Sequence, residues 1–127
     1  MAYDLRQKRR VAKILVVDDD ITTLKNVAFF LRSKGYQVVE AQDGNEASER
    51  LAKDGLDLVV SEVMLPGING IRLLKQAQSL APGVPVLLMS AFPSIDPYQV
   101  IYLGAADFIE KPFLLDNLLY KIKRTLE

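Results

Sequence analysis

Short apolar runs alternate along the chain with stretches of helical period, and this alternation constrains the fold more than any other feature. Helical stretches are expected to begin near Ile21, Asn45, Gly70, Asp96 and Leu114. The apolar runs of strand length cover residues 14–17, 37–41, 58–61, 84–89 and 107–109. Five consecutive βα units predict an α/β fold in which helices cover both faces of a doubly wound parallel sheet.

Details within these runs refine that prediction. The runs at 14–17, 58–61 and 84–89 are continuously aliphatic, as expected for strands covered on both faces, whereas 37–41 alternates and is interpreted as an edge strand. Gly35 and Gly55 lie where the first two helices should end, in the position of C-terminal caps.

Composition limits the chain to one domain and excludes several kinds of site. With 127 residues, 50% hydrophobic and 25% charged, the chain can build a single core. Sixteen basic and sixteen acidic residues cancel, so no overall field favours direct nucleic acid or membrane binding. The absence of cysteine excludes thiol chemistry and is compatible with the cytoplasm, where we expect the domain. The absence of histidine removes a general base, a metal ligand and any phosphohistidine donor.

The N-terminal segment differs from the rest in composition. Residues 1–12 are basic, with Arg6, Lys8, Arg9 and Arg10, and contain no apolar stretch. They are interpreted as a solvated tail rather than a signal peptide or membrane anchor, and residues 13–127 as the folded domain.

Polar side chains follow the apolar runs at the edge where ligands of doubly wound sheets bind. Asp20 alone is better explained as the cap of the helix that begins at Ile21. Acids from the first and third strands, if about 5 Å apart, would repel by roughly 3 kcal/mol at a dielectric near 20. Mg²⁺ or Mn²⁺ suits such oxygens, and a lysine can add a fixed charge. The side chains concerned are Asp18, Asp19, Asp20, Glu62, Ser90 and Lys111.

Four ordered motifs carry a resemblance to a known family. "ILVVDDD" (14–20), "SEVMLPGING" (61–70), "LLMSAF" (87–92) and "GAADFIEKPF" (104–113) together resemble the receiver domain of bacterial two-component response regulators over residues 13–126. The resemblance implies a flavodoxin-like fold with strand order 2-1-3-4-5.

The resemblance also implies roles for individual residues. Asp18 and Asp19 would place Mg²⁺, with Glu62 and the backbone carbonyl of Met64 as further ligands. The remaining implied roles are Ser90 as the switch hydroxyl, Phe108 as the switch aromatic, Lys111 as the contact to phosphoryl oxygens, and a cis Lys111–Pro112 bond.

Glu62 departs from the family pattern, which has a phospho-accepting aspartate at this position. Asp57 cannot replace it, because it lies about 16 Å away at the wrong end of the strand. Glutamate moves the carboxylate by about 1.5 Å, and about 1 Å of misplacement can cost roughly a hundredfold in rate. We therefore expect loss of phosphorylation and weakened Mg²⁺ binding. The longer arm could instead reach toward Ser90 and Lys111 as a phosphoryl mimic with one charge rather than nearly two.

Partners follow from the resemblance as well. They would be a sensor histidine kinase or phosphotransfer protein, and a downstream output domain or protein at the face of the fourth helix, fifth strand and fifth helix. The fourth helix should be short, about two turns, because Pro97 fits its first position. Tyr98, Tyr102 and Tyr120 either lie on this face or pack inward.

Two other classes compete with a phosphorylation-independent interaction module that is not an enzyme. A Mg²⁺-dependent phosphohydrolase is formally compatible with the spacing of Asp18 and Asp20, but 127 residues leave no cap to enclose a substrate. A flavin or nucleotide binder lacks the glycine-rich phosphate loop that should follow the first strand.

Overall fold

The computed structural model describes residues 11–92 and 94–127. The expected basic tail, apart from Val11 and Ala12, lies outside the described residues. Five parallel strands form one sheet in the order β2-β1-β3-β4-β5, as the family resemblance implies. The elements in chain order are β1 (Lys13–Val17), α2 (Ile21–Ser33), β2 (Gln37–Ala41), α3 (Gly44–Lys53), β3 (Leu58–Glu62), α4 (Gly70–Leu80), β4 (Val86–Ser90), α5 (Pro97–Tyr102), β5 (Asp107–Glu110) and α6 (Leu115–Leu126).

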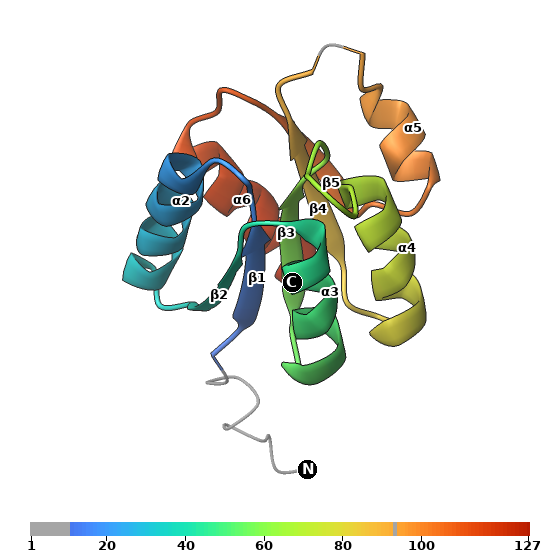
Figure 1. Ribbon diagram of the computed structural model, residues 1–127. Helices are drawn as coiled ribbons and strands as arrows, with labels where there is room; N and C mark the ends of the chain where they lie inside the picture. Colours follow the sequence, from blue (N-terminus) through green and yellow to red (C-terminus); the bar gives the residue numbers. More distant parts are fainter. Residues whose placement is uncertain (1–10, 93) are drawn as a thin grey trace, which may run out of the picture.

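The helices form a layer on each face of the sheet. Helices α2 and α6 cover one face, and α3, α4 and α5 cover the other (Figure 1). Alternation along β1 shows how one strand serves both layers: Ile14 and Val16 pack with α2 and α6, while Leu15 and Val17 pack with α3 and α4. Successive side chains of a strand point to opposite faces, so a strand covered on both sides must be apolar throughout.

Strand positions agree with the sequence except at their ends. The run expected at 84–89 becomes β4 at Val86–Ser90. Val84 closes a turn by donating to the carbonyl of Ala81 at 3.0 Å, and Pro85 has no N–H for the ladder. Glu62, expected just after the third strand, is instead its last residue, paired in register with Met89. The predicted edge strand, β2, does lie at one edge of the sheet.

Helix ends follow the capping residues visible in the sequence. Asp20 caps α2 by accepting from the amide of Thr22, and Asp96 caps α5 by accepting from the amide of Tyr98. Gly35 and Gly55 have φ of 96° and 59° just beyond α2 and α3, which favours glycine and confirms the two predicted C-terminal caps. Helix α5 has 6 residues, in agreement with the short helix expected from Pro97.

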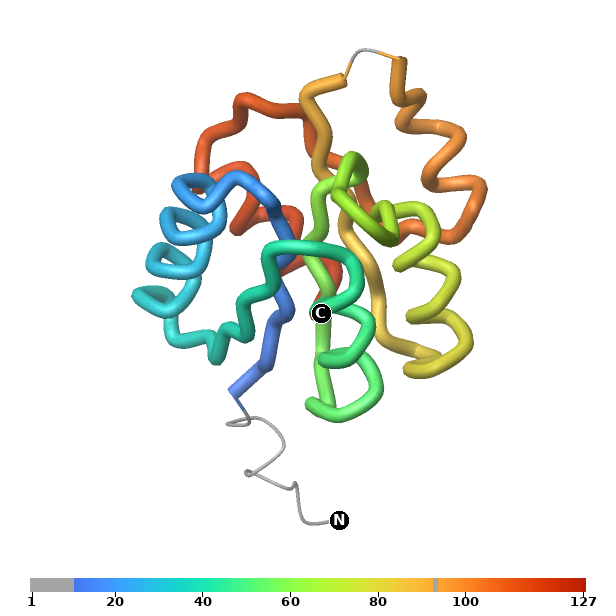
Figure 2. The backbone as a smooth tube through the Cα atoms, in the orientation of Figure 1, coloured from blue at the N-terminus to red at the C-terminus, as the bar shows by residue number. Residues whose placement is uncertain are grey.

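All five parallel strands end at the same edge. The loops after β1, β3, β4 and β5 gather there, which is the upper edge in Figure 2. Segments far apart in the sequence are thereby brought together at this edge. Within the described residues, none of the helices is long and apolar enough to span a membrane.

Candidate functional site

Asp18 is the first acidic side chain at this edge, directly after β1. It is 1% exposed, and its amide donates to the carbonyl of Ala41 at 3.1 Å, which continues the pairing of β1 with β2. Its Oδ1 accepts from the amide of Asp20 at 2.9 Å, and its Oδ2 lies 2.6 Å from Nζ of Lys111. Both oxygens of this buried carboxylate are therefore engaged.

Glu62 comes from the neighbouring strand β3 and is 6% exposed. Its Oε1 accepts from Lys111 at 3.0 Å, and its Oε2 accepts from the amide of Val63 at 2.8 Å. The loop that follows returns to the strand end, where the amide of Gly70 donates to the carbonyl of Val63 at 2.8 Å. The side chain thus curls back onto its own backbone while its other oxygen reaches the lysine.

Lys111 joins the two carboxylates in the ion pairs that close the site. Its side chain is 16% exposed, and its amide donates to the carbonyl of Ser90 at 2.9 Å, which extends the pairing of β5 with β4. Burial acts to lower the pKa of the ammonium, but the hydrogen bonds to Asp18 and Glu62 and their charges outweigh it, so the pKa lies above its usual value. The peptide bond between Lys111 and Pro112 is cis, as expected from the resemblance.

Ser90 and Phe108 come from β4 and β5, the strand beside β3 and the strand that leads to Lys111. The hydroxyl of Ser90, 1% exposed, accepts from the amide of Phe92 at 3.1 Å. Phe108 is half-buried and packs against the core beneath α3, α4 and α5. The residues implied as switch elements thus lie at the end of β4 and within β5.

The other acids of the predicted site are arranged differently. The side chain of Asp19 is exposed. Asp20 faces the start of α2, where hydrogen bonds from the hydroxyl of Thr23 and the amide of Thr22 lower its pKa. Asp20 is thus the helix cap that the sequence favoured, and its engagement gives no support to a phosphohydrolase. The side chain of Met64 is 46% exposed.

The oxygen donors of the site are of a type that suits a divalent metal, but their arrangement does not suit one. Carboxylate oxygens are the right donors for Mg²⁺. Across residues 11–92 and 94–127, however, no three acidic side chains are grouped so as to hold a metal ion. Asp18 and Glu62 direct one oxygen each at Lys111 instead. As arranged, the residues do not fit a metal.

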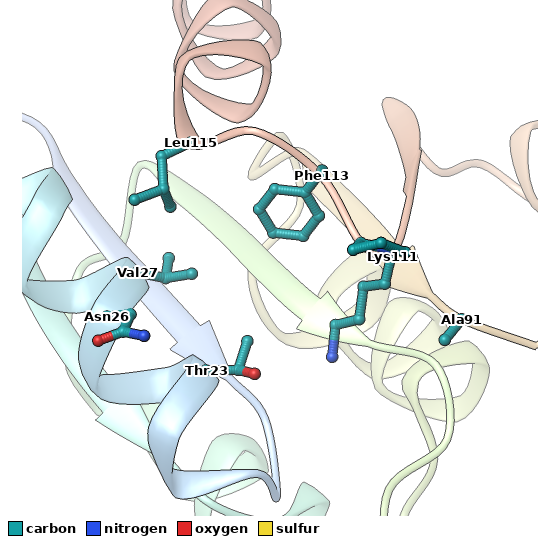
Figure 3. Close-up of a pocket in the computed structure, with 8 residues that line it drawn as sticks. Thr23, Asn26, Val27, Ala91, Lys111, Phe113 and Leu115 are labelled. Carbon is teal, nitrogen blue, oxygen red and sulfur yellow. The ribbon is translucent and has the colours of Figure 1, made fainter.

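A pocket of about 440 Å³ opens beside the cluster, between α2 and the segment after β5. Figure 3 shows the Lys111 side chain extending into it toward Thr23 of α2, with the ring of Phe113 between Lys111 and Leu115 on the same segment as the lysine. Asn26 and Val27 continue the wall along α2. The lysine is therefore held by its ion pairs rather than by close packing on every side.

The sequence profile of the response regulator receiver domain matches residues 14–123. The chain belongs to this family. Among curated relatives, this receiver domain is 37% identical over 114 residues to the transcriptional regulatory protein ZraR of Escherichia coli (strain K12). It is 36% identical over 115 residues to the response regulator MprA of Mycolicibacterium vanbaalenii. These matches cover 89% and 90% of this chain but only 26% and 50% of the relatives, which are much longer.

Solved structures agree with the profile. A CheY-like response regulator receiver domain from Methanospirillum hungatei JF-1 superposes with a TM-score of 0.87 at 30% identity, covering 92% of this chain and 94% of that one. The receiver domain of NtrX from Brucella abortus gives 0.83 at 34% identity, covering 89% and 97%. The flavodoxin-like fold and the two-component family are thus confirmed. Receiver domains are generally non-enzymatic signalling modules that bind Mg²⁺ and work with histidine kinases and output domains.

Three contributors to the receiver site were missed from the sequence. The amides of Asp20 and Val63 each occupy one oxygen of a buried carboxylate, and Gly70 allows the chain to return against Glu62. A Cβ at Gly70 would lie 2.5 Å from the carbonyl oxygen of Glu62. The glycine at the start of a helix was the one available signal, since backbone amides are invisible in a residue pattern.

Proposed function

We propose that this receiver domain transmits signals without accepting a phosphoryl group, as a protein-interaction module whose state Glu62 sets. One observation carries the proposal: Oε1 of Glu62 already lies 3.0 Å from Nζ of Lys111. By resemblance, that ammonium is the group that contacts phosphoryl oxygens in the family. A permanent carboxylate thus already pairs with the lysine that a phosphoryl group would otherwise contact.

The geometry of Glu62 also disfavours its use as a nucleophile. One oxygen accepts from Lys111 and the other from the amide of Val63, so each already has a hydrogen-bond donor. In-line phosphoryl transfer needs a positioned, unobstructed oxygen, and misplacement of about 1 Å costs on the order of a hundredfold in rate. Glutamate in this conformation therefore fills the acceptor position without serving as the acceptor.

The Glu62 carboxylate mimics a phosphoryl group only in part, and this affects how the domain would change conformation. The carboxylate brings one negative charge where a phosphoryl group brings nearly two. Ser90, the switch hydroxyl of our proposal, bonds to the amide of Phe92 rather than to Glu62. Phe108, the proposed switch aromatic, stays half-buried against the core. A protein partner with different affinity for the two conformations would then complete the switch.

Mg²⁺ binding belongs to the same proposal in a weakened form. Asp18, Asp19, Glu62 and the carbonyl of Met64 are the proposed ligands. Glu62 lowers the affinity because its longer arm is committed to Lys111 and to its own backbone. The domain would retain carboxylates of the right type without a ready arrangement of them.

Partners are proposed at the face formed by α5, β5 and α6. Tyr98 and Tyr102 of α5 and Tyr120 of α6 are 85%, 88% and 62% exposed, so they do not pack inward and are available for such a partner. Exposed aromatic residues are common anchors of protein interfaces. A histidine kinase or phosphotransfer protein on one side and an output domain or downstream protein on the other are the expected partners.

The remaining parts of the proposal concern the domain boundaries, the class of protein and its location in the cell. We assign the receiver unit to residues 13–127, with a basic tail at 1–12. The unit would act as a binding module rather than an enzyme, in the cytoplasm, without direct contact to nucleic acid or membrane. The balanced charge of the chain supports the last point.

Intact-protein mass spectrometry tests the proposal. The protein is incubated with Mg²⁺ and a small acyl phosphodonor, beside Glu62→Asp and Glu62→Gln. The native chain and Glu62→Gln should keep their mass, whereas Glu62→Asp, which restores the acceptor of the family, should gain one phosphate. A phosphate-sized gain on the native chain would show that Glu62 is an acceptor after all.

A further inference from the structure

We propose that Lys111 is the resident cation of this site and takes the place that a divalent metal holds in the family. The inference rests on the proposed function, because a site that accepts no phosphoryl group has no need of a metal for transfer. It concerns how the buried acids are neutralised. Two carboxylates and one ammonium are brought together there from β1, β3 and the end of β5.

The position of the ammonium supports this assignment. Nζ of Lys111 lies 2.6 Å from Oδ2 of Asp18 and 3.0 Å from Oε1 of Glu62, so a single charge bridges both acids. The two carboxylates are 1% and 6% exposed. Buried charges require a partner, and here each finds the same one.

The oxygens that face away from Lys111 are also occupied. Oδ1 of Asp18 accepts from the amide of Asp20 at 2.9 Å, and Oε2 of Glu62 accepts from the amide of Val63 at 2.8 Å. Every side-chain oxygen of the two buried acids therefore has an N–H donor. A carboxylate oxygen with one amide donor keeps a second lone pair, so these amides alone do not exclude a metal. Mg²⁺ demands near-octahedral oxygen ligands at about 2.0–2.1 Å, so between the two acids it would have to displace the ammonium from Oδ2 of Asp18 and Oε1 of Glu62.

The net charge of the cluster also disfavours a divalent metal while the lysine is present. Asp18, Glu62 and Lys111 together carry one net negative charge, whereas the same cluster without the lysine carries two. A divalent ion placed between the carboxylates would meet an ammonium that is itself in contact with both. Loss of the ammonium both opens the ligands and doubles the charge that attracts a metal.

The surroundings of Lys111 explain why a variant can test the idea. Its amide is held by the carbonyl of Ser90, and its side chain borders the pocket toward Thr23 (Figure 3). No tight shell encloses the side chain on that side. Replacing it by glutamine keeps a hydrogen-bond donor near Asp18 and Glu62 and removes only the charge and some length.

The experiment measures Mn²⁺ binding by electron paramagnetic resonance of the free ion, in the absence of any phosphodonor, with Mg²⁺ competition for specificity. Lys111→Gln should bind Mn²⁺ at least about tenfold more tightly than the native chain. Lys121→Gln is the matched control, since Lys121 also forms an ion pair, at 3.1 Å with Asp107, outside the site. It should bind as weakly as the native chain.

Three results would overturn the inference. The native chain could bind Mn²⁺ as tightly as Lys111→Gln, neither could bind, or Lys121→Gln could gain as much affinity. A second measurement does not depend on the folding of any variant. The ¹H–¹⁵N signal of the Lys111 ammonium in the native chain should remain unchanged at the Mg²⁺ concentration of the cytoplasm, and a shift at that concentration would show that the metal displaces the lysine.

Failure of this inference can be told apart from failure of the proposed function. Tight metal binding without a mass gain from the phosphodonor would refute the role of Lys111 and leave the proposed function standing. A mass gain on a native chain that binds no metal would refute the proposed function and leave the role of Lys111 standing.

Discussion

Gly70→Ala should disturb the site by displacing the backbone of Glu62. Gly70 is the first residue of α4, and an added Cβ would lie 2.5 Å from the carbonyl oxygen of Glu62 and 2.8 Å from Cα of Val63. Ordinary contact begins at 3.4 Å, so the loop must open by the difference from 2.5 Å, about 0.9 Å. Both obstructing atoms belong to the backbone, which cannot rotate away as a flexible side chain would.

The energy follows from two opposing effects. Overpacking of this kind costs about 1–3 kcal/mol. Alanine in place of glycine in the middle of a helix returns about 0.5–1 kcal/mol, and at the first position of α4 we expect about the lower value. The net loss in free energy of unfolding is therefore about 0.5–2.5 kcal/mol. For a domain of this size, each kcal/mol corresponds to roughly 3–5 °C in melting temperature. Movement of Glu62 by a similar distance would also lengthen its contact with Lys111, now 3.0 Å.

Urea unfolding and the ammonium signal of Lys111 measure the two consequences separately. Gly35→Ala serves as control: Gly35 has φ of 96° and nothing within 4 Å of a Cβ, so alanine there introduces backbone strain of about 1–2 kcal/mol without touching the site. Only Gly70→Ala should shift the Lys111 signal. A Gly70→Ala protein as stable as the native chain, or one whose Lys111 signal matches that of Gly35→Ala, would refute the reasoning.

Further changes test other parts of the structure. The hydrogen bond from Lys25, with another from Arg32, lowers the pKa of Glu40, so its stabilisation is present above about pH 4.3 and is lost as the pH falls through the lowered pKa. Melting temperature between about pH 5 and 2 should therefore fall less steeply in Glu40→Gln than in the native chain. Leu118→Ala, at a fully buried position of α6, should cost about 2–5 kcal/mol in urea unfolding. Asp96→Ala removes the cap of α5 and should cost about 1 kcal/mol, seen as faster hydrogen exchange in that helix; unchanged exchange would contradict the capping role.

The fold could be predicted from the sequence because its signals are repetitive. Each buried strand is an aliphatic run, and the helix starts carry caps such as Asp20 and Asp96, so local preference and burial point to the same elements. The predicted element boundaries were wrong where a single backbone group determines the end of a strand. Val84 is apolar enough for a strand, but its amide closes a turn and Pro85 offers no donor, so β4 begins two residues later than expected.

The site was predictable as a set of residues but not as a set of contacts. Topology places Asp18, Glu62 and Lys111 at one edge, and the structure brings these three together. Asp19 was expected beside them, yet its side chain is exposed. β1 ends at Val17 and Asp19 lies at a bend beyond it, so the alternation of strand side chains does not give the direction of the Asp19 side chain.

The extra methylene of Glu62 has a consequence that residue type alone does not reveal. A longer arm was expected to extend toward both Ser90 and Lys111. In the structure its length is taken up by curling, because Oε2 returns to the amide of Val63 while Oε1 meets Lys111. The hydroxyl of Ser90 is left to the amide of Phe92. We infer that the carboxylate satisfies the lysine and not the hydroxyl, so a conformational change that requires Ser90 must draw its free energy from a bound partner rather than from Glu62.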